Sequence, residues 1–435
     1  MTKKNLLQFV CLIMFLFIGR TILLYLIEPV DYSIYFNRII RNKAEANNNH
    51  IDLVFIGDSR PHRAFDPAVF EKELEISSAF NASSGLQPIE ASYYLLKDIS
   101  EHYSVKYAVL GITSGTFFKN ESTVAKVIVL DRLHGLNKLR FLLSSFTSDE
   151  YLNAVSLCYR FRNNFTLSNI RDNLLEKREL RKNHYTERKS GPDLYTDSGF
   201  IYSYQTGEIG NAADSRYNLK RVSPIKIEYF QKIVSLCEEK GIRLFLVTPP
   251  WSIMNIYQAE NYQDLTDYFK ETAAEYDLSY VNLNYLRGRE EWLGDQMMFD
   301  SGHVNGEGAE LVSEKYAQIL KSELEDKEIP DMFYKNLAEL KADVHRIFAI
   351  GADIWTENFI SEIRINSRQS EEIKPLFRVL ISIDGENYSP VSDWSDKTEI
   401  SINVSSYSGS VYYMIESKTR TGDPGPYVTY RKAVQ

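Results

Sequence analysis

Three side chains of this sequence have the types needed for nucleophilic catalysis. Ser59 follows the mostly apolar residues 51–56 and ends a Gly-Asp-Ser motif, whereas Asp300 and His303 lie three residues apart, just before residues 306–324. A serine hydroxyl is a poor nucleophile at neutral pH. It needs an imidazole to take its proton and a carboxylate to orient that imidazole. We therefore predict that Ser59 is the nucleophile, that His303 is its base and that Asp300 orients His303.

Each half of this pattern is weak by itself. A Gly-Asp-Ser tripeptide often marks only a turn, and an Asp-x-x-His pair often caps a helix or makes a surface hydrogen bond. The context strengthens both halves, because residues 51–56 predict a buried strand and residues 306–324 an amphipathic helix of one α/β pattern.

His62 is a rival base, because it lies only three residues after Ser59. Pro61 fixes its own φ and restricts Arg60 toward extended conformations. We therefore interpret His62 as a loop histidine that is carried away from the serine. The side chains of Arg60 and Arg63 could hold an anionic group of a substrate.

The composition limits the class of protein. The chain has 435 residues, enough for two or three domains, and its net charge of -9 argues against a nucleic-acid partner. We interpret Cys11, Cys158 and Cys237 as free or buried thiols. No histidine or cysteine pair has ligand spacing, so we predict neither a metal ion nor another cofactor.

The N-terminal segment predicts a membrane anchor. Lys3 and Lys4 precede an apolar stretch, residues 5–27, which is long enough to span a bilayer if Arg20 reaches toward one interface. No small-x-small cleavage site follows, which favours an uncleaved signal anchor over residues 1–30. The two lysines place the N-terminus in the cytoplasm and the bulk of the chain outside it.

Strands and helices alternate after this anchor, which predicts a parallel sheet covered by helices on both faces. We expect a three-layer αβα domain over residues 31–330, with an insertion at residues 115–220. In such sheets the chemistry lies at the carboxyl ends of the strands, where Ser59 is placed. The expected strands are residues 51–56, 78–81, 106–112, 242–247 and 279–283, and the expected helices are residues 67–74, 88–101, 224–240, 261–276 and 306–324.

Two further regions have open roles. Residues 176–189, in the insertion, are dense in charge and predict either a solvated helix or a lid or docking surface for an anionic polymer. Residues 344–435 show short alternating runs and a turn at Asp384-Gly385, which predict an antiparallel β-sandwich. That domain could bind a glycan, or it could be a spacer or a dimer interface.

The motifs resemble those of the SGNH (GDSL-type) hydrolase superfamily over residues 51–324. Gly57-Asp58-Ser59 is similar to the nucleophile block of that family, and Asn81-Ala82-Ser83-Ser84-Gly85 to its second block. Asp300-Ser301-Gly302-His303 is similar to its last block. The resemblance implies that Gly85 contributes to an oxyanion hole, together with the backbone N–H of Arg60.

The third block departs from the family pattern. An asparagine is expected after the third strand, where its amide would help to hold the oxyanion, and Thr113 stands there instead. A hydroxyl can still donate, so Thr113 is the third predicted oxyanion donor. Loss of one such donor typically costs about 3 kcal/mol of transition-state stabilisation.

Within the superfamily, the chain is similar to the membrane-anchored branch that includes alginate and cellulose O-acetylation proteins and teichoic-acid D-alanyl-transfer proteins. This resemblance implies acyl transfer to a cell-surface or exported polysaccharide, beside a membrane-bound O-acyltransferase that supplies the acyl group. A carbohydrate O-acyl esterase is the alternative within enzymes. An inactive scaffold of a polysaccharide-modification complex is the alternative outside them.

Overall fold

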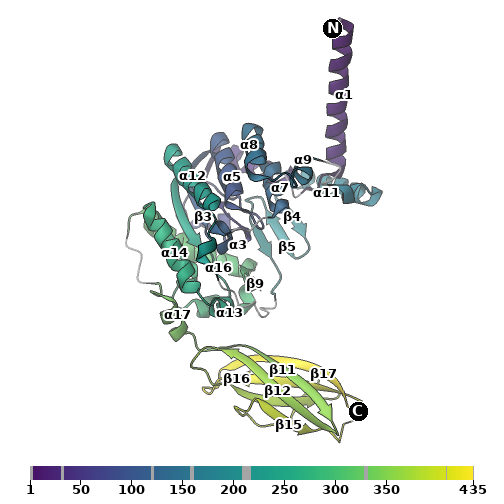
Figure 1. The fold of residues 1–435 in the computed structure, drawn as a ribbon, viewed down its shortest axis with the longest axis vertical. Coiled ribbons are helices and arrows are strands. Elements are labelled where there is room, and N and C mark those ends of the chain that lie inside the picture. The colour runs from purple at the N-terminus through teal and green to yellow at the C-terminus, as the bar shows by residue number, and fades with distance from the viewer. Residues whose placement is uncertain are drawn as a thin grey trace. The chain divides into compact units, whose positions relative to one another are not determined.

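The computed structural model describes residues 3–30, 34–118, 122–156, 161–207, 217–327, 332–407 and 409–434. The chain forms two compact units, Met1–Met332 and Phe333–Gln435. Figure 1 shows helices around a sheet in the first unit and strands in the second. Residue 330, the predicted end of the catalytic domain, and Cys158 lie outside the described residues.

A five-stranded parallel sheet forms the centre of the first unit, which confirms the predicted α/β class. Leu53 of β1 (His50–Ile56), the second strand of the sheet, pairs with Ala79 of the edge strand on one side and with Tyr107 of the central strand on the other. Six of the seven residues of β1 are buried, Asp52 among them, and its otherwise apolar sequence is typical of a sheet covered on both faces. Across the sheet the strands are β2 (Ala79–Asn81), β1 (His50–Ile56), β3 (Ser104–Gly111), β7 (Arg243–Thr248) and β8 (Ser279–Asn282).

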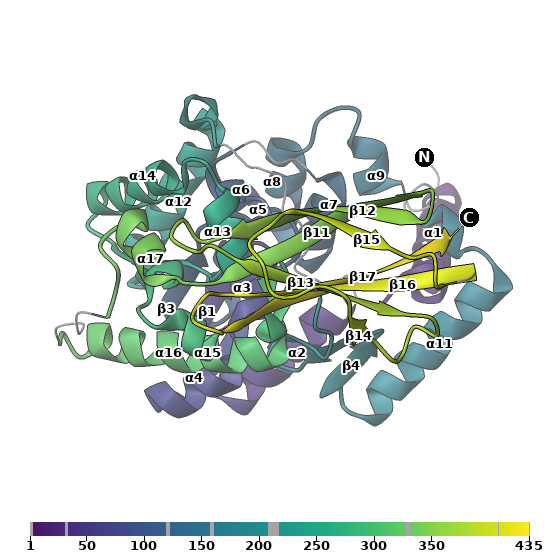
Figure 2. The same cartoon turned by 90° about the horizontal axis from the view of Figure 1, so that it is seen from below.

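Helices cover both faces of this sheet. Figure 2 shows α5 and α12 on one side of β1 and β3, and α4 and α16 on the other. Helix α12 illustrates the local signals, because Pro224 opens its first turn and Gly241 ends it at φ +66°. The helices are α3 (Ser59–Ala64), α4 (Pro67–Leu74), α5 (Ile89–His102), α12 (Pro224–Lys240), α13 (Ile253–Gln258), α14 (Tyr262–Glu275), α15 (Arg289–Trp292) and α16 (Gly306–Leu324), with short 3-10 turns η3 (Leu283–Tyr285) and η4 (Asp295–Met297).

The N-terminal segment forms helix α1 (Lys3–Ile27), which is long and apolar enough to cross a membrane. Nearly all of its side chains are exposed, unlike those of a core helix. Helix α2 (Ile34–Ala46) follows it and buries one apolar face. The structure therefore supports a membrane anchor or a signal sequence at this end of the chain.

The insertion is more structured than its sequence predicts. The helix expected over residues 176–189 ends at Lys182, because its last residues turn into a strand that begins at Glu187. That strand is the edge of a three-stranded antiparallel sheet that sequence reasoning missed. The elements are α6 (Ser114–Phe117), α7 (Thr123–Arg132), α8 (Gly135–Ser145), α9 (Tyr151–Val155), η1 (Arg162–Asn164), α11 (Leu167–Lys182), β4 (Glu187–Ser190), β5 (Asp193–Thr196), β6 (Ile201–Ser203) and η2 (Leu219–Arg221).

The second unit consists of two antiparallel sheets, ordered β11-β12-β15 and β14-β13-β16-β17. One apolar core joins the sheets, with Ile363 from the first and Tyr413 from the second. The predicted turn at Asp384-Gly385 follows β13, and Gly385 has φ +82°. The elements are α17 (Leu337–Asp343), β11 (Ile347–Glu357), β12 (Ile360–Gln369), β13 (Leu376–Ser382), β14 (Ser389–Pro390), β15 (Glu399–Asn403), β16 (Gly409–Lys418) and β17 (Pro424–Val434).

Candidate active site

The chain makes a tight turn at the carboxyl end of β1, and this turn presents Ser59. Gly57 has φ +146°, and a Cβ there would lie 2.7 Å from Cγ of Pro61. A Cβ on Gly111, at the end of the neighbouring strand β3, would lie 2.6 Å from the same atom. Pro61 therefore fits between two strand ends only because both carry glycine.

Ser59 is the first residue of helix α3, and Asp58 caps that helix by accepting a hydrogen bond from the backbone N–H of Arg60. The sequence predicted a loop here, because Pro61 restricts the residue before it. The prediction was wrong because Pro61 lies in the first turn of the helix, where a missing N–H breaks no hydrogen bond.

The other two predicted residues come from a small two-stranded ribbon, β9 (Met298–Asp300) and β10 (His303–Val304). The carbonyl of Ser301, at its turn, accepts hydrogen bonds from the backbone N–H of Ser252 and from Nδ2 of Asn255. These two bonds fix the loop between Asp300 and His303. Neither donor was predicted from the sequence, because only the fold brings α13 to this loop.

The fold brings Ser59, His303 and Asp300 together. Oγ of Ser59 lies 2.7 Å from Nε2 of His303, although 244 positions separate them. Nδ1 of His303 lies 2.8 and 2.9 Å from the two carboxylate oxygens of Asp300. Since an ionised carboxylate only accepts, Nδ1 carries the proton and Nε2 is free to accept the serine hydrogen. The three groups thus have the contacts of a Ser-His-Asp triad.

Hydrogen bonding keeps Asp300 ionised. Burial raises the pKa of this carboxyl, but hydrogen bonds from His303 and from the backbone N–H of Gly302 outweigh burial. The pKa of Asp300 therefore lies below its usual value. A negative charge at this position stabilises the imidazolium that forms when His303 takes a proton.

His62 is placed away from the serine. It lies in α3 rather than in a loop, it is buried, and its Nε2 is 3.0 Å from the carbonyl oxygen of Gly199 in the insertion. Burial, together with the charges of Arg132 and Arg63, lowers the pKa of His62 to about 3. His62 is thus a neutral, buried donor near neutral pH.

Two predicted oxyanion donors contact Asp58 in this structure. The backbone N–H of Arg60 donates to one oxygen of this carboxylate at 3.0 Å, and the Thr113 hydroxyl donates to the other at 2.6 Å. Gly85, the third predicted donor, lies in an exposed turn. An oxyanion role for Arg60 or Thr113 stays a prediction that requires the bond to Asp58 to break.

The two arginines after Ser59 have different environments. Arg63 makes two hydrogen bonds to Asp193 on β5, at 2.7 and 3.1 Å, so its charge is already paired. The guanidinium of Arg60 lies 4.3 Å from the centre of the Trp251 ring, and its Nη1 is buried without a hydrogen-bond partner among the residues that the structure describes. Of the two, Arg60 is therefore the one whose charge is not already paired with a described carboxylate.

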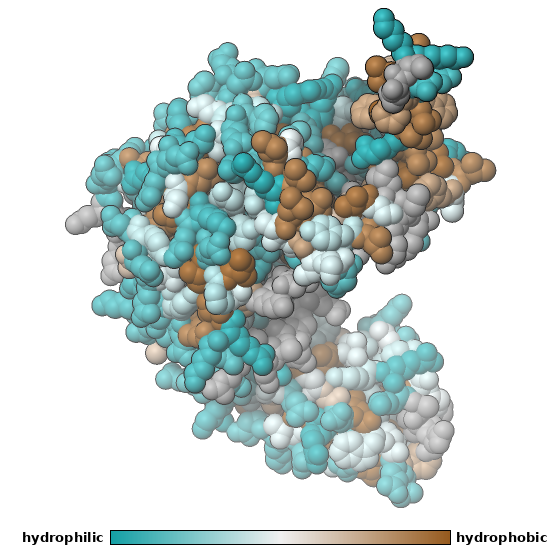
Figure 3. Space-filling model, turned by 45° about the horizontal axis from the view of Figure 1, so that its top comes forward, coloured by the Kyte–Doolittle hydropathy of each residue, from teal (hydrophilic) through white to brown (hydrophobic). Residues whose placement is uncertain are grey.

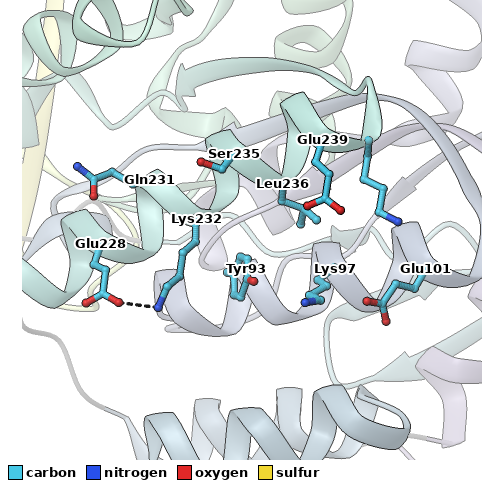
Figure 4. A pocket seen from close by; sticks show the side chains of 10 residues that line it. Tyr93, Lys97, Glu101, Glu228, Gln231, Lys232, Ser235, Leu236 and Glu239 are labelled. Atoms are coloured by element: carbon cyan, nitrogen blue, oxygen red, sulfur yellow. Dashed lines mark hydrogen bonds and ion pairs between the residues drawn. The ribbon is translucent and has the colours of Figure 1, made fainter.

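Other candidate sites lie elsewhere or lack the necessary groups. Within the described ranges, no group of three His, Cys, Asp or Glu side chains could hold a metal ion. A hollow of about 310 Å³ lies between α5 and α12. Figure 4 shows that its lining side chains, such as Lys97 and Glu228, are mostly polar or charged. None of the triad residues lines it.

Comparisons with known proteins identify no family. No family model matches the chain, and no curated protein matches it. One similar solved structure is a proposed acylhydrolase from Bacteroides fragilis, with 11% identity, coverage of 66% of this chain and 96% of the other, and a TM-score of 0.29. Another is an engineered protein with 12% identity, coverage of 94% and 98%, and a TM-score of 0.14. At these scores neither likeness carries information on function.

Proposed function

We propose that this protein is a serine esterase or O-acyltransferase. The observation that carries the proposal is the chain of short contacts from Ser59 through His303 to Asp300. This arrangement supplies a nucleophile, a general base and an orienting carboxylate at the carboxyl end of the sheet.

The proposed reaction proceeds through an acyl-enzyme. Nε2 of His303 takes the proton of Ser59 while Oγ bonds to the carbonyl carbon of an acyl ester. The tetrahedral intermediate collapses, the bond to the leaving alcohol breaks, and His303 returns the proton to that alcohol. An acceptor hydroxyl or water then loses its proton to His303 and attacks the acyl group. The bond between the acyl carbon and Oγ breaks, and His303 returns the proton to Oγ of Ser59.

We further propose that α1 anchors the protein in a membrane and that both units lie outside the cytoplasm. The length and apolar character of α1 support the anchor, and Lys3 and Lys4 support the orientation. A reporter fused to the C-terminus should be active only outside the cytoplasm. A cytoplasmic signal would contradict the orientation.

The resemblance to the membrane-anchored SGNH branch supports a polysaccharide hydroxyl as acceptor and a membrane-bound O-acyltransferase as acyl donor. Transfer and hydrolysis differ only in the second nucleophile. Addition of soluble oligosaccharides to the purified protein tests this point. The ratio of acylated sugar to free acid should rise with sugar concentration, and a constant ratio would favour the esterase.

An inactive scaffold is the second candidate, and one observation favours it. The Arg60 N–H and the Thr113 hydroxyl both donate to Asp58, which leaves neither free for an oxyanion. The deciding experiment is hydrolysis of p-nitrophenyl acetate by the full-length protein in detergent. We expect turnover that Ser59→Ala abolishes and that Ser122→Ala, at the cap of α7, leaves unchanged. A parent protein without turnover would favour the scaffold.

A further inference from the structure

The insertion carries an unusual concentration of exposed apolar side chains. Among the described residues of the first unit outside α1, nine of the twelve exposed large apolar side chains lie between Val124 and Leu175. We define the insertion patch as seven of them. These are Leu136, Leu139 and Leu143 on α8, Leu152 and Val155 on α9, and Phe165 and Leu167 at the start of α11.

The spacing of these residues gives each helix an apolar outer face. Leu136, Leu139 and Leu143 are separated by three and four positions, so they form one stripe along α8. Their side chains are 67%, 50% and 64% exposed, whereas Phe141 points inward and is fully buried. Soluble monomers rarely expose apolar patches of this kind without a partner.

The α11 edge of the patch lies beside the end of helix α1. Carbonyl groups at the end of α1 and of the residue after it accept hydrogen bonds from α11 and the turn before α11. Lys177 donates to Tyr25 and Glu28 at 2.6 and 2.7 Å, and Asn164 donates to Ile27 at 3.0 Å. Phe165 directly follows Asn164 in the sequence. The point where α1 leaves the bilayer is therefore fixed against one edge of the patch.

The figures agree with this placement. Figure 1 shows α7, α8, α9 and α11 at the end of the first unit from which α1 projects. In Figure 3, α1 projects at the top right, and several apolar side chains, coloured brown, lie on the surface next to its base. Two basic residues adjoin the leucine stripe on α8, Arg140 and Lys138, of which Lys138 lies 3.8 Å from Asp131. Apolar side chains framed by basic ones are typical of segments that lie in a membrane interface.

We propose that the insertion patch lies in the headgroup region of the bilayer that α1 spans. The inference rests on the proposed anchoring role of α1 and adds a second membrane contact. Because α1 and the patch are joined by the Lys177 and Asn164 hydrogen bonds, the two contacts would hold the first unit in one orientation. The occupant is the lipid surface itself, and not a protein partner.

Depth-dependent fluorescence quenching tests this contact in the full-length protein. The probe is an environment-sensitive dye on one cysteine, introduced as Leu139→Cys or Leu152→Cys after the native thiols are removed as Cys11→Ser, Cys158→Ser and Cys237→Ala. The protein is reconstituted in phosphatidylcholine and phosphatidylglycerol vesicles with spin-labelled acyl chains. Ile225→Cys, on α12, is the matched control because Ile225 is 49% exposed but lies outside the patch.

We expect quenching at both patch positions to exceed that of the control at least about twofold, because an interfacial residue reaches the acyl boundary. Equal quenching at all three positions overturns the inference. The inference is also overturned if the dye is shielded from water in native membranes but exposed to water in the lipid vesicles. A membrane protein, and not lipid, would then cover the patch.

Two parallel readouts separate this test from the proposed function. After the vesicles are washed with alkaline carbonate, the protein should remain bound to them. Release of the protein would show that α1 does not anchor it and would overturn the inference as well. Ester hydrolysis by the same vesicles reports on Ser59 and is independent of quenching. An active, anchored protein with unquenched dye therefore refutes the patch alone.

Discussion

Asp300→Asn is the substitution for which the structure gives the most specific prediction. In the parent, Oδ1 of Asp300 accepts from the backbone N–H of Gly302 at 2.7 Å, and both oxygens accept from Nδ1 of His303. An asparagine oxygen would keep the bond to Gly302, which leaves the amide NH₂ facing His303. Nδ1 must then accept a hydrogen, so the ring proton moves to Nε2.

That tautomer blocks the proposed chemistry. With a proton on Nε2, His303 donates to Ser59 and cannot take its hydrogen. The same substitution in a Ser-His-Asp protease lowers kcat by about 10⁴-fold, which corresponds to about 5 kcal/mol of activation free energy. We expect a loss of this order in kcat/KM for p-nitrophenyl acetate.

The assay needs a control for charge and folding. Asp193→Asn also removes a carboxylate near the site, but Asp193 contacts Arg63 rather than His303. It should keep activity within about tenfold of the parent, about 1.4 kcal/mol. An Asp300→Asn protein that melts like the parent and keeps more than about a tenth of its kcat/KM would refute the proposed role of Asp300.

Three further outcomes follow from the same geometry. His303→Gln should fall to the level of Ser59→Ala in ester hydrolysis, because the two groups act as a unit, whereas His62→Gln should keep at least about a tenth of the parent rate; the reverse order would show that the wrong base was chosen. Because the pKa of His62 is about 3 in the folded protein, the unfolded chain binds more protons below about pH 6.5, so stability should fall by about 2 kcal/mol from pH 7 to 5. Comparing denaturant unfolding of the parent and His62→Gln at the two pH values isolates this loss, which the variant should lack. Thr113→Val removes the 2.6 Å hydrogen bond to Asp58 and the bond that the hydroxyl accepts from the backbone N–H of Gly115, and should lower the free energy of unfolding by about 1.5–3 kcal/mol; an unchanged denaturation midpoint would contradict a structural role for these bonds.

The sequence predicted the central sheet well because β1, β3 and β7 are mostly apolar and are followed or ended by Gly57, Gly111 and Pro249. Residues 51–56 became β1 (His50–Ile56), and residues 67–74 became α4 with the same bounds. The periodicity and the end signals agree there, so local and global preferences point to one structure.

The missed elements have weaker local signals. Helix α3 begins with Ser59 and contains Pro61, which suggested a loop. Strand β4 consists of the polar residues Glu187–Ser190, whose pattern resembles a solvated helix. Strands β11 and β17 were not predicted either, although each runs for 11 residues. Their stability depends on pairing with distant strands, which no local pattern reveals.

In the candidate site, too, some features could be read from the local sequence and others depend on contacts between distant residues. The types and order of Ser59, Asp300 and His303 are legible in the sequence, and only the fold gives the distances between them. The contacts of Asp58 with Thr113 and of His62 with Gly199 depend on neighbouring loops, so the sequence could not predict them. The roles of the three triad residues remain predictions.

The most direct test of the account is the acyl-enzyme itself. The full-length protein is mixed with p-nitrophenyl acetate, quenched in acid within milliseconds to seconds and digested for peptide mass spectrometry. We predict one acetyl group on the peptide that contains Ser59, formed before steady state and absent when His303→Gln replaces the parent. An acetyl group that maps to another residue, or hydrolysis by a folded Ser59→Ala protein at the parent rate, would contradict the assignment of Ser59 as the nucleophile.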